Sequence, residues 1–348
     1  MGRERPISVR CISLKGDASG DKRYCGVDAE AMAKFAIALF DRSWMDRMAD
    51  DLDAMNDCKV GHPFVFPDSV IIWGMTLRAA LGMSYRLARG VVNVFLRDAG
   101  IEGISLSQFY DRCVELSMPE LGGRADVDNR ILAYGCCDVP PSETAVTVAI
   151  DSTGISLNKY GGWLAHRWNK RPVTGWVKIH VCVDVDTNRI LAYVITDESC
   201  GDSTCLDLLM EQVLSSGRRV KKLLVDAAYD SKDAWERYTG MRIDVVINIR
   251  SSSLGKYAPT GYQKVSCKGS FARRRQIVRI LQIGRDEWKL EMGYGMRWKV
   301  ECTFSDLKRL FGDILRARAR WNDVAEAYQK IRVLNIYKGC RQQALMEA

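Results

Sequence analysis

The hydrophobic period of the chain changes at Pro140 and Pro141, and this change constrains the fold more than any other feature. Before the two prolines, apolar residues recur at helical spacing in the stretches 31–48, 70–81 and 84–96. After them come short alternating or continuous apolar runs, which are typical of strands. A double proline favours an extended connection over a helix. We therefore expect a helical domain over residues 1–140 and an α/β domain over 141–348.

The second half of the chain predicts elements in the order βββαβαβ, closed by a long helix. The strands are expected at 146–150, 177–183, 190–196, 220–225 and 244–249. The short connection between the second and third strands predicts an antiparallel hairpin. The first helix is expected to begin at a cap formed by Asp202 or Ser203 and to end at Gly217, and a short one surrounds Trp235. This order predicts a mixed sheet flanked by helices.

One stretch does not fit a simple α/β core. Residues 251–270 are rich in Ser, Gly, Lys and Tyr, and we expect a basic surface insertion near 251–275. The run 276–283 that follows has the composition of a strand. Together they form either a DNA contact or a loop with an edge strand, and composition does not separate the two.

The N-terminal half offers a candidate DNA-binding element. Gly100 and Gly103 interrupt the helical pattern, and Ser105 is a typical N-cap for a helix through Leu116. With the preceding helix at 84–96, this makes a helix, turn and helix that can enter a groove of DNA. The turn is longer than the usual three or four residues, which favours a packed helical bundle instead.

Composition excludes several classes of protein. The chain is 47% hydrophobic over 348 residues, which predicts folded domains with ordinary cores. The longest apolar stretch, 70–81, contains Arg78 and falls short of the roughly 20 residues that a membrane helix requires. The N-terminus lacks the apolar core of a signal peptide, and the 12 cysteines are scattered. We therefore expect a cytoplasmic protein with reduced thiols and no membrane association.

The charge distribution indicates a polyanionic partner. The formal net charge is +8, and the cations gather in the half that follows the prolines. They form clusters at Arg167, Lys170, Arg171 and Lys178, at Lys264, Lys268, Arg273, Arg274 and Arg275, and at Lys308, Arg309, Arg316, Arg318 and Arg320. Any one cluster has a solvated surface as its ordinary explanation, but their concentration favours phosphate binding that weakens as salt rises.

Two aspartates stand where apolar strand runs end. Asp151 ends the run VTVAID, and Asp226 ends the run VKKLLVD. A carboxylate in such a place is costly to bury unless charge or hydrogen bonds compensate, and a coordinated metal ion supplies the compensating charge. Each position has an ordinary alternative, because DSTG after Asp151 is typical of a turn and Asp230 competes with Asp226.

A third carboxylate lies in YGMRWKVECTFSDLK near the C-terminus. At roughly 100° per residue, a helix projects Tyr294, Arg297, Glu301 and Lys308 from one narrow face. An apolar stripe beside this face can pack the helix and leave the polar stripe facing a site: Val300, Phe304, Leu307 and Phe311. The alternative is that Arg297 and Glu301 form an ordinary i, i+4 pair on a solvated helix.

The spacing of these four residues resembles the Tyr-x2-Arg-x3-Glu-x6-Lys signature of DDE transposases from bacterial and archaeal insertion sequences. DAAYD, beginning at Asp226, is similar to the Asp-x-x-Tyr-Asp of the same family, whose first aspartate is a metal ligand. The resemblance implies a ribonuclease H-like core over roughly residues 144–340, preceded by a helical domain. It also implies that Asp151, Asp226 and Glu301 are the catalytic residues and hold Mg²⁺, with Mn²⁺ as a substitute.

The resemblance further implies an enzyme that cuts and joins double-stranded DNA at the ends of its own mobile element, as a homodimer or larger assembly at the nucleoid. Arg297 and Lys308 are expected to contact phosphates, and Tyr294 to orient the helix or contact the DNA strand. Weaker DNA-contact candidates lie in KRPVTGWVKIHVCVD, at Lys170, Arg171 and Lys178. The alternatives are a metal-dependent nuclease without strand transfer and a non-catalytic DNA-binding protein on the same fold.

Overall fold

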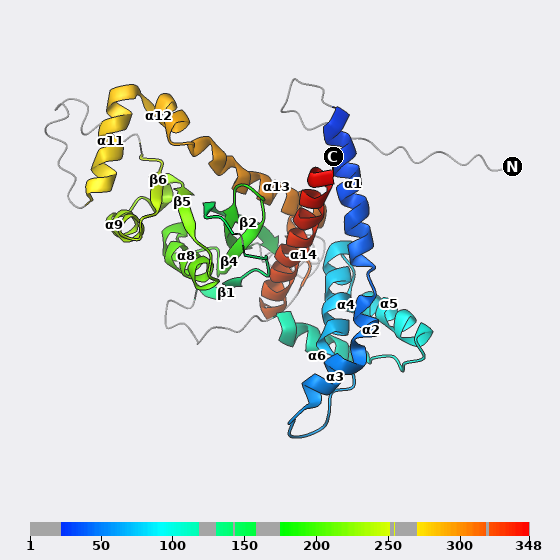
Figure 1. Ribbon diagram of the computed structural model, residues 1–348. Helices are drawn as coiled ribbons and strands as arrows, with labels where there is room; N and C mark the ends of the chain where they lie inside the picture. The colour runs from blue at the N-terminus through cyan, green and yellow to red at the C-terminus, as the bar shows by residue number, and fades with distance from the viewer. Residues whose placement is uncertain are drawn as a thin grey trace, which may run out of the picture.

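A computed structural model describes residues 22–117, 130–141, 143–157, 175–250, 254, 270–317 and 320–347. At its centre is a seven-stranded sheet in the order β1-β4-β3-β2-β5-β6, with β7 beside β2 (Figure 1). The strands are β1 (Ile131–Cys136), β2 (Val146–Leu157), β3 (Trp176–Asp184), β4 (Ile190–Asp197), β5 (Val220–Val225), β6 (Asp244–Ile247) and β7 (Ile314–Leu315).

The sheet is mixed, as expected. Strand β3 runs antiparallel to both of its neighbours, β2 and β4, which confirms the predicted hairpin, whereas β5 and β6 extend the sheet in parallel from β2. The expected order βββαβαβ is confirmed from β2 to β6. This order and its flanking helices are consistent with the ribonuclease H-like fold. Strand β1 was not expected, and it pairs antiparallel with β4 at the edge of the sheet.

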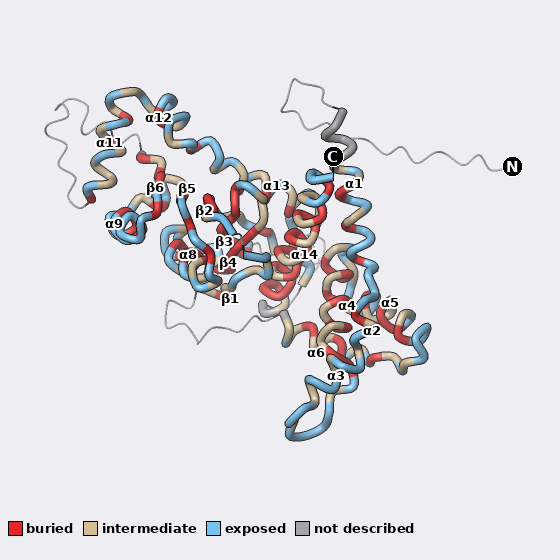
Figure 2. Tube along the Cα trace, in the orientation of Figure 1, coloured by how far each residue is buried: buried red, intermediate tan, exposed pale blue. Residues whose placement is uncertain are grey.

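Helices cover both faces of the sheet. On one face, α8 (Leu206–Ser215) and α9 (Lys232–Gly240) pack in a core with Val148 and Ile150 of β2. On the other face, α13 (Trp298–Phe311) and α14 (Arg320–Glu347) share a core with Ala149. Successive side chains of a strand point to opposite faces, so β2 contributes alternate residues to each core. Figure 2 shows buried segments concentrated in the strands and along α14.

The N-terminal helices form a second layer beside α14 (Figure 1). They are α1 (Lys22–Leu39), α2 (Ser43–Asp46), α3 (Met48–Asn56), α4 (Asp68–Leu81), α5 (Tyr85–Asp98) and α6 (Leu106–Ser117). Helices α1, α4 and α6 pack against α14, and α2, α3 and α5 pack against α4. Phe35 of α1 meets Tyr337 of α14 edge to face, with ring centroids 5.6 Å apart. Arg78 of α4 donates to Gln329 Oε1 at 2.9 Å. Helix α14 therefore contacts both the sheet and the N-terminal helices.

Local caps explain where the N-terminal predictions hold and where they fail. Ser84 accepts from the amide of Leu87 at the start of α5, and Ser105 accepts from the amide of Gln108 at the start of α6, so both expected helix starts are confirmed. The stretch 31–48 is mainly helical, as expected, but a break at 40–42 divides it between α1 and α2. Asp41 accepts from the amide of Ser43 at 3.1 Å and from its hydroxyl at 2.8 Å, and this local turn separates α1 from α2.

Two further predictions need correction. The run 276–283 is helical, because Ser270 caps α11 (Phe271–Ile283) and the buried Ile277 and Ile280 lie on one helical face. Asp202 begins a 3₁₀ turn, η1 (Asp202–Cys205), whose N-cap is Gly201, so its side chain does not cap a helix. Apart from residue 254, the segment 251–269 of the expected basic insertion lies outside the described residues.

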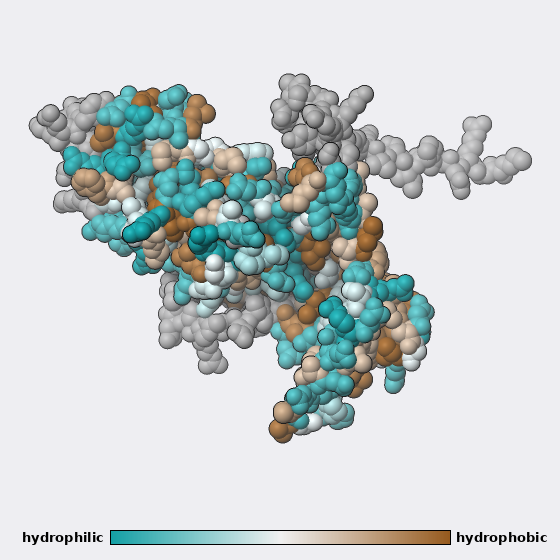
Figure 3. Space-filling view, in the orientation of Figure 1, coloured by the Kyte–Doolittle hydropathy of each residue, from teal (hydrophilic) through white to brown (hydrophobic). Residues whose placement is uncertain are grey.

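The part of the surface described in Figure 3 is mainly hydrophilic, with hydrophobic residues between the hydrophilic ones. Isolated exposed apolar side chains are ordinary on a folded protein. Among the helices that the structure describes, none combines the length and the apolar character needed to cross a bilayer.

Candidate active site

Strand pairing brings Asp151 and Asp226 together. Ile150 of β2 pairs in parallel with Val225 of β5, so the two aspartates occupy the next position on neighbouring strands. Neighbouring strands lie roughly 4.8 Å apart. Strand β5 ends at Val225, whereas β2 continues past Asp151 to Leu157 and remains paired with β3. The alternative of a turn at DSTG is therefore wrong.

Helix α13 brings the third carboxylate to the same face. Asp151 follows Ile150 and so points to the side of the sheet that α13 covers. Arg297 Nη1 donates to Asp151 Oδ2 at 2.7 Å, and its Nη2 donates to Glu301 Oε1. One guanidinium thus contacts two of the acidic residues, although Glu301 itself is 57% exposed.

The signature residues do not lie on one continuous α-helix. Tyr294 and Arg297 belong to a 3₁₀ turn, η5 (Tyr294–Arg297), and α13 with Glu301 and Lys308 follows directly. Gly293 precedes the turn with φ of 64°, a conformation that favours glycine. Tyr294 is buried and its hydroxyl donates to the carbonyl of Val225 at 3.3 Å, beside Asp226. The turn is therefore tied to the end of β5.

The electrostatics agree with this clustering. Burial raises the pKa of Asp151 above its ordinary value, and this effect outweighs the lowering by the Ser152 amide and by Arg297. The negative charge of Asp226 adds to the rise. Burial likewise raises the pKa of Tyr294 to about 12. Asp151 thus carries a desolvated carboxylate with another acid close enough to repel it.

The donor set fits Mg²⁺ in kind, because carboxylate oxygens are the protein ligands that this ion prefers. Within the described residues, however, no three acidic, histidine or cysteine side chains are grouped closely enough to hold a metal ion as they stand. Asp151 and Glu301 are instead held in ion pairs with Arg297. A shared metal therefore requires Arg297 to release one or both carboxylates.

Asp230, the competitor of Asp226, is already engaged. Its carboxylate accepts from Arg273 Nε at 2.8 Å and Nη2 at 2.7 Å, and from Trp235 Nε1 at 2.9 Å. The side chain is only 8% exposed. These contacts tie α11 to α9 and give Asp230 a structural explanation.

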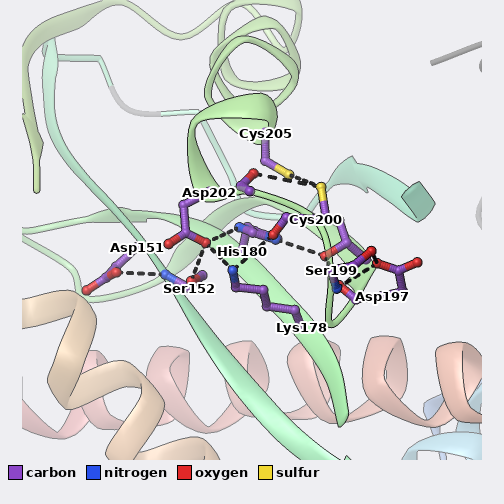
Figure 4. A network of polar contacts seen from close by, with 11 residues as sticks. Asp151, Ser152, Lys178, His180, Asp197, Ser199, Cys200, Asp202 and Cys205 are labelled. Carbon is purple, nitrogen blue, oxygen red and sulfur yellow. Dashed lines mark hydrogen bonds and ion pairs between the residues drawn. The ribbon is translucent and has the colours of Figure 1, made fainter. Parts of the chain in front are cut away.

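Of the weaker DNA-contact candidates, the structure describes Lys178. Lys178 lies on β3, where its Nζ pairs with Asp202 at 2.6 Å and donates to the carbonyl of Cys200 at 3.1 Å (Figure 4). Lys170 and Arg171 lie outside the described residues.

Sequence reasoning missed Ser152. Its backbone amide donates to Asp151 Oδ1 at 2.8 Å, and its hydroxyl donates to Asp202 Oδ1 at 2.8 Å (Figure 4). A serine inside a strand carries no local signal for such a role. Only the alternation of β2, which sends Asp151 and Ser152 to opposite faces, could have indicated it.

Comparison with known families agrees with this arrangement. The family model described as a transposase DDE domain matches residues 143–336, which includes Asp151, Asp226 and the signature segment. The match extends over more than half of the sequence and spans the sheet from β2 to β7. The chain therefore belongs to the DDE transposase family.

Proposed function

We propose that the protein catalyses Mg²⁺-dependent cleavage and strand transfer of DNA at the ends of an insertion sequence. Its partner is double-stranded DNA, both the element ends and the target. Two ends must be held together for such a reaction, so the working form is a homodimer or a larger assembly on DNA. The setting is the cytoplasm, at the nucleoid. The family supports the DNA-transposing class, and the neighbouring Asp151 and Asp226, with Glu301 reached through Arg297, support the chemistry.

In this proposal Asp151, Asp226 and Glu301 hold Mg²⁺, or Mn²⁺ in its place. Two such ions bound by these residues would supply activation of an attacking water or 3′-hydroxyl and stabilisation of the leaving oxygen of an in-line displacement. The two aspartates supply the paired part of the site, because the register of β2 and β5 places them side by side. Glu301 completes it from α13.

The contact of Arg297 with both Asp151 and Glu301 is the observation that carries the proposal. An arginine fork binds a phosphate as readily as a carboxylate, so DNA can compete for Arg297 and release the acids. Lys308 extends the same cationic stripe along α13 as a point charge for the backbone. Lys170, Arg171 and Lys178 remain weaker proposals for DNA contact, with Lys178 already paired to Asp202.

We also propose that the N-terminal helices, within residues 1–140, form the domain that binds DNA. Helices α4 and α5 are joined by only Gly82, Met83 and Ser84, and Gly82 has φ of 61°. This tighter turn is closer to a helix-turn-helix than the pair expected from sequence. The side chains of Arg86 and Arg97 are exposed on α5, where they can meet phosphates.

A strand-transfer assay tests the proposed function. Duplex DNA carrying the element ends is incubated with Mg²⁺ and a target plasmid, and joined products are compared for the unmodified chain, Asp226→Asn and Asp233→Asn. Asp233 is an exposed residue of α9 and serves as the matched control. Joined product that disappears only in Asp226→Asn supports the proposal. Nicking without joining would identify a nuclease, and binding without either would identify a non-catalytic protein.

A further inference from the structure

A polar cluster lies against the back of the strand that carries Asp151. Asp202 Oδ1 lies 2.6 Å from Lys178 Nζ, 2.8 Å from Ser152 Oγ and 3.6 Å from His180 Nδ1 (Figure 4). His180 is fully buried, and its other nitrogen lies 3.0 Å from Thr196 Oγ1. The cluster thus joins three strands to the start of η1.

The register explains why these side chains meet. Ser152 of β2 is the direct cross-strand partner of His180 of β3, and Gly154 is the partner of Lys178. All of them share the sheet face that α8 covers, whereas Asp151 points to the opposite face. Ser152 is the link, because its hydroxyl reaches Asp202 on one side while its amide holds Asp151 Oδ1 on the other.

The charges within the cluster compensate one another. Burial lowers the pKa of His180 to about 4, so the ring is neutral near pH 7. Although burial opposes it, the hydrogen bonds from Lys178 and Ser152 lower the pKa of Asp202, which stays ionised. The charges that remain are the Asp202 carboxylate and the Lys178 ammonium, which compensate each other. A compensated, hydrogen-bonded pair of this kind fixes geometry well.

The two oxygens of Asp151 are held differently. Oδ2 is held by Arg297, the contact that must open for the acids to share a metal, whereas Oδ1 is held by the Ser152 amide. Once Arg297 leaves, the Ser152 amide is the contact that still orients the carboxylate. Its position depends on how firmly the Ser152 segment is fixed, and Asp202 fixes it from behind.

We propose that Asp202 is a positioning residue for Asp151, acting through Ser152 to hold the carboxylate in the orientation that binds the metal. The inference rests on the proposed function, in which Asp151 is a metal ligand. Partners that orient a ligand from behind typically contribute 10- to 100-fold in metal affinity or activity. Asp202 does not contact the DNA or the metal in this proposal.

Metal binding and catalysis test the proposal separately. Mn²⁺ binding to the full chain without DNA is followed by the electron paramagnetic resonance signal of the free ion, and the site that Asp151→Asn removes is taken as the reference. We expect Asp202→Ala to weaken this site by about tenfold or more. The Mg²⁺ midpoint for DNA nicking should rise in parallel, while the rate at saturating Mg²⁺ and the affinity for DNA without metal stay close to those of the unmodified chain.

Milder variants protect the test against a folding defect. Ser152→Ala keeps the Asp202–Lys178 pair and should weaken Mn²⁺ binding in the same way, whereas Ser152→Thr keeps the hydroxyl and should restore it. The double variant Asp202→Ala/Ser152→Ala should be no weaker than the worse single variant, because both act through one contact. Asp207→Asn is the control, since the Asp207 carboxylate of α8 contacts Arg237 and the Tyr238 hydroxyl, neither of which belongs to this cluster.

The outcomes separate the two proposals. If Asp151→Asn loses the Mn²⁺ site but Asp202→Ala and Ser152→Ala bind as the unmodified chain does, the positioning role is wrong and the proposed function stands. Additive losses in the double variant would also overturn the route through Ser152. If Asp151→Asn binds Mn²⁺ and nicks DNA normally, the proposed function itself fails. If Asp202→Ala does not fold, the comparison of Ser152→Ala with Ser152→Thr tests the positioning role instead.

Discussion

Arg297 and Asp151 form an ion pair of 2.7 Å across the candidate active site, and the same guanidinium contacts Glu301. The pair is well shielded, because the side chains are only 17% and 25% exposed. Arginine therefore neutralises two of the acids where a divalent ion is proposed to do so. Metal and DNA phosphate are expected to replace this internal contact together.

Replacing Arg297 separates its two effects. We expect Arg297→Gln to bind Mn²⁺ on the order of tenfold more tightly without DNA, because the variant has no cation at this position to compete with the metal for the carboxylates. The same variant should bind DNA more weakly, since the phosphate fork is lost. The electron paramagnetic resonance signal of free Mn²⁺ measures the metal affinity, and gel-shift titrations measure the DNA affinity. Arg309→Gln, also on α13, is the control, and unchanged Mn²⁺ affinity in Arg297→Gln would contradict the exchange.

Lys308 is predicted to bind the DNA backbone rather than a base. Lys308→Ala should weaken binding similarly for every duplex sequence and should reduce the slope of log K against log salt by about one. Fluorescence anisotropy between low and moderate salt gives the slope. Lys289→Ala should leave the slope unchanged, because Lys289 is half-exposed on α12 (Arg285–Glu291) and pairs with Asp286. A sequence-dependent loss at Lys308 would point to base reading instead.

His180 is predicted to make stability depend on pH. Burial lowers its pKa to about 4, from 6.5 in the unfolded chain, with Asp202 opposing and Lys178 assisting the shift. Between these values the unfolded chain binds a proton that the folded chain does not. The contribution of neutral His180 to the free energy of unfolding is therefore complete above about pH 6.5. It falls by roughly 3 kcal/mol as the pH drops to about 4.

Urea unfolding at pH 7.5, 6 and 5 measures this dependence. His180→Gln should be less stable at pH 7.5 but should lose less stability than the unmodified chain as pH falls to 5. Equal pH slopes for the two proteins would show that other groups carry the effect.

Asp306 is predicted to stabilise the contact between α13 and α14. It pairs with Lys338, whose side chain is 1% exposed, and with Arg309 at 2.9 Å. Asp306→Ala leaves a buried ammonium and should cost about 3 to 5 kcal/mol of unfolding free energy. Burial already lowers the pKa of Lys338, so deprotonation places an upper limit on the cost.

Chemical denaturation of Asp306→Ala and of Asp306→Ala/Lys338→Met checks this prediction. The double variant should recover most of the loss, because no charge remains buried. If the two variants are equally unstable, the loss comes from packing and not from the stranded ammonium.

The strands of the sheet could be predicted because each has a local signal. The Val and Ile residues that alternate in β3 and the continuous apolar runs of β2 and β5 are typical of buried strands, although His180 and Cys182 between them in β3 are buried as well. Strand β1 shows no such contrast with its surroundings, since ILAYGC is a short apolar run that also suits a buried helix. Its partner β4 decides the matter, and that contact is not local.

The site divides along the same line. Sequence indicates Asp151, Asp226 and Glu301 by residue type and by position in the chain. The family resemblance adds the prediction that the three carboxylates lie in one site. The contacts of Ser152 and Asp202 depend on the pairing of β2 with β3, so no local pattern indicates them. In 276–283 the β-branched residues suggested a strand, but the Ser270 cap and helical packing outweigh that propensity.

The small strand β7 bears on how the site can move. Ser156 and Leu157 of β2 pair with Ile314 and Leu315, just beyond the C-terminal end of α13. This pairing links the strand that carries Asp151 to the C-terminal end of the helix that carries Glu301. Because Tyr294 also ties the turn before α13 to the end of β5, this helix is anchored to the sheet at both ends, and Arg297 can release the acids by rotation of its side chain without movement of the helix.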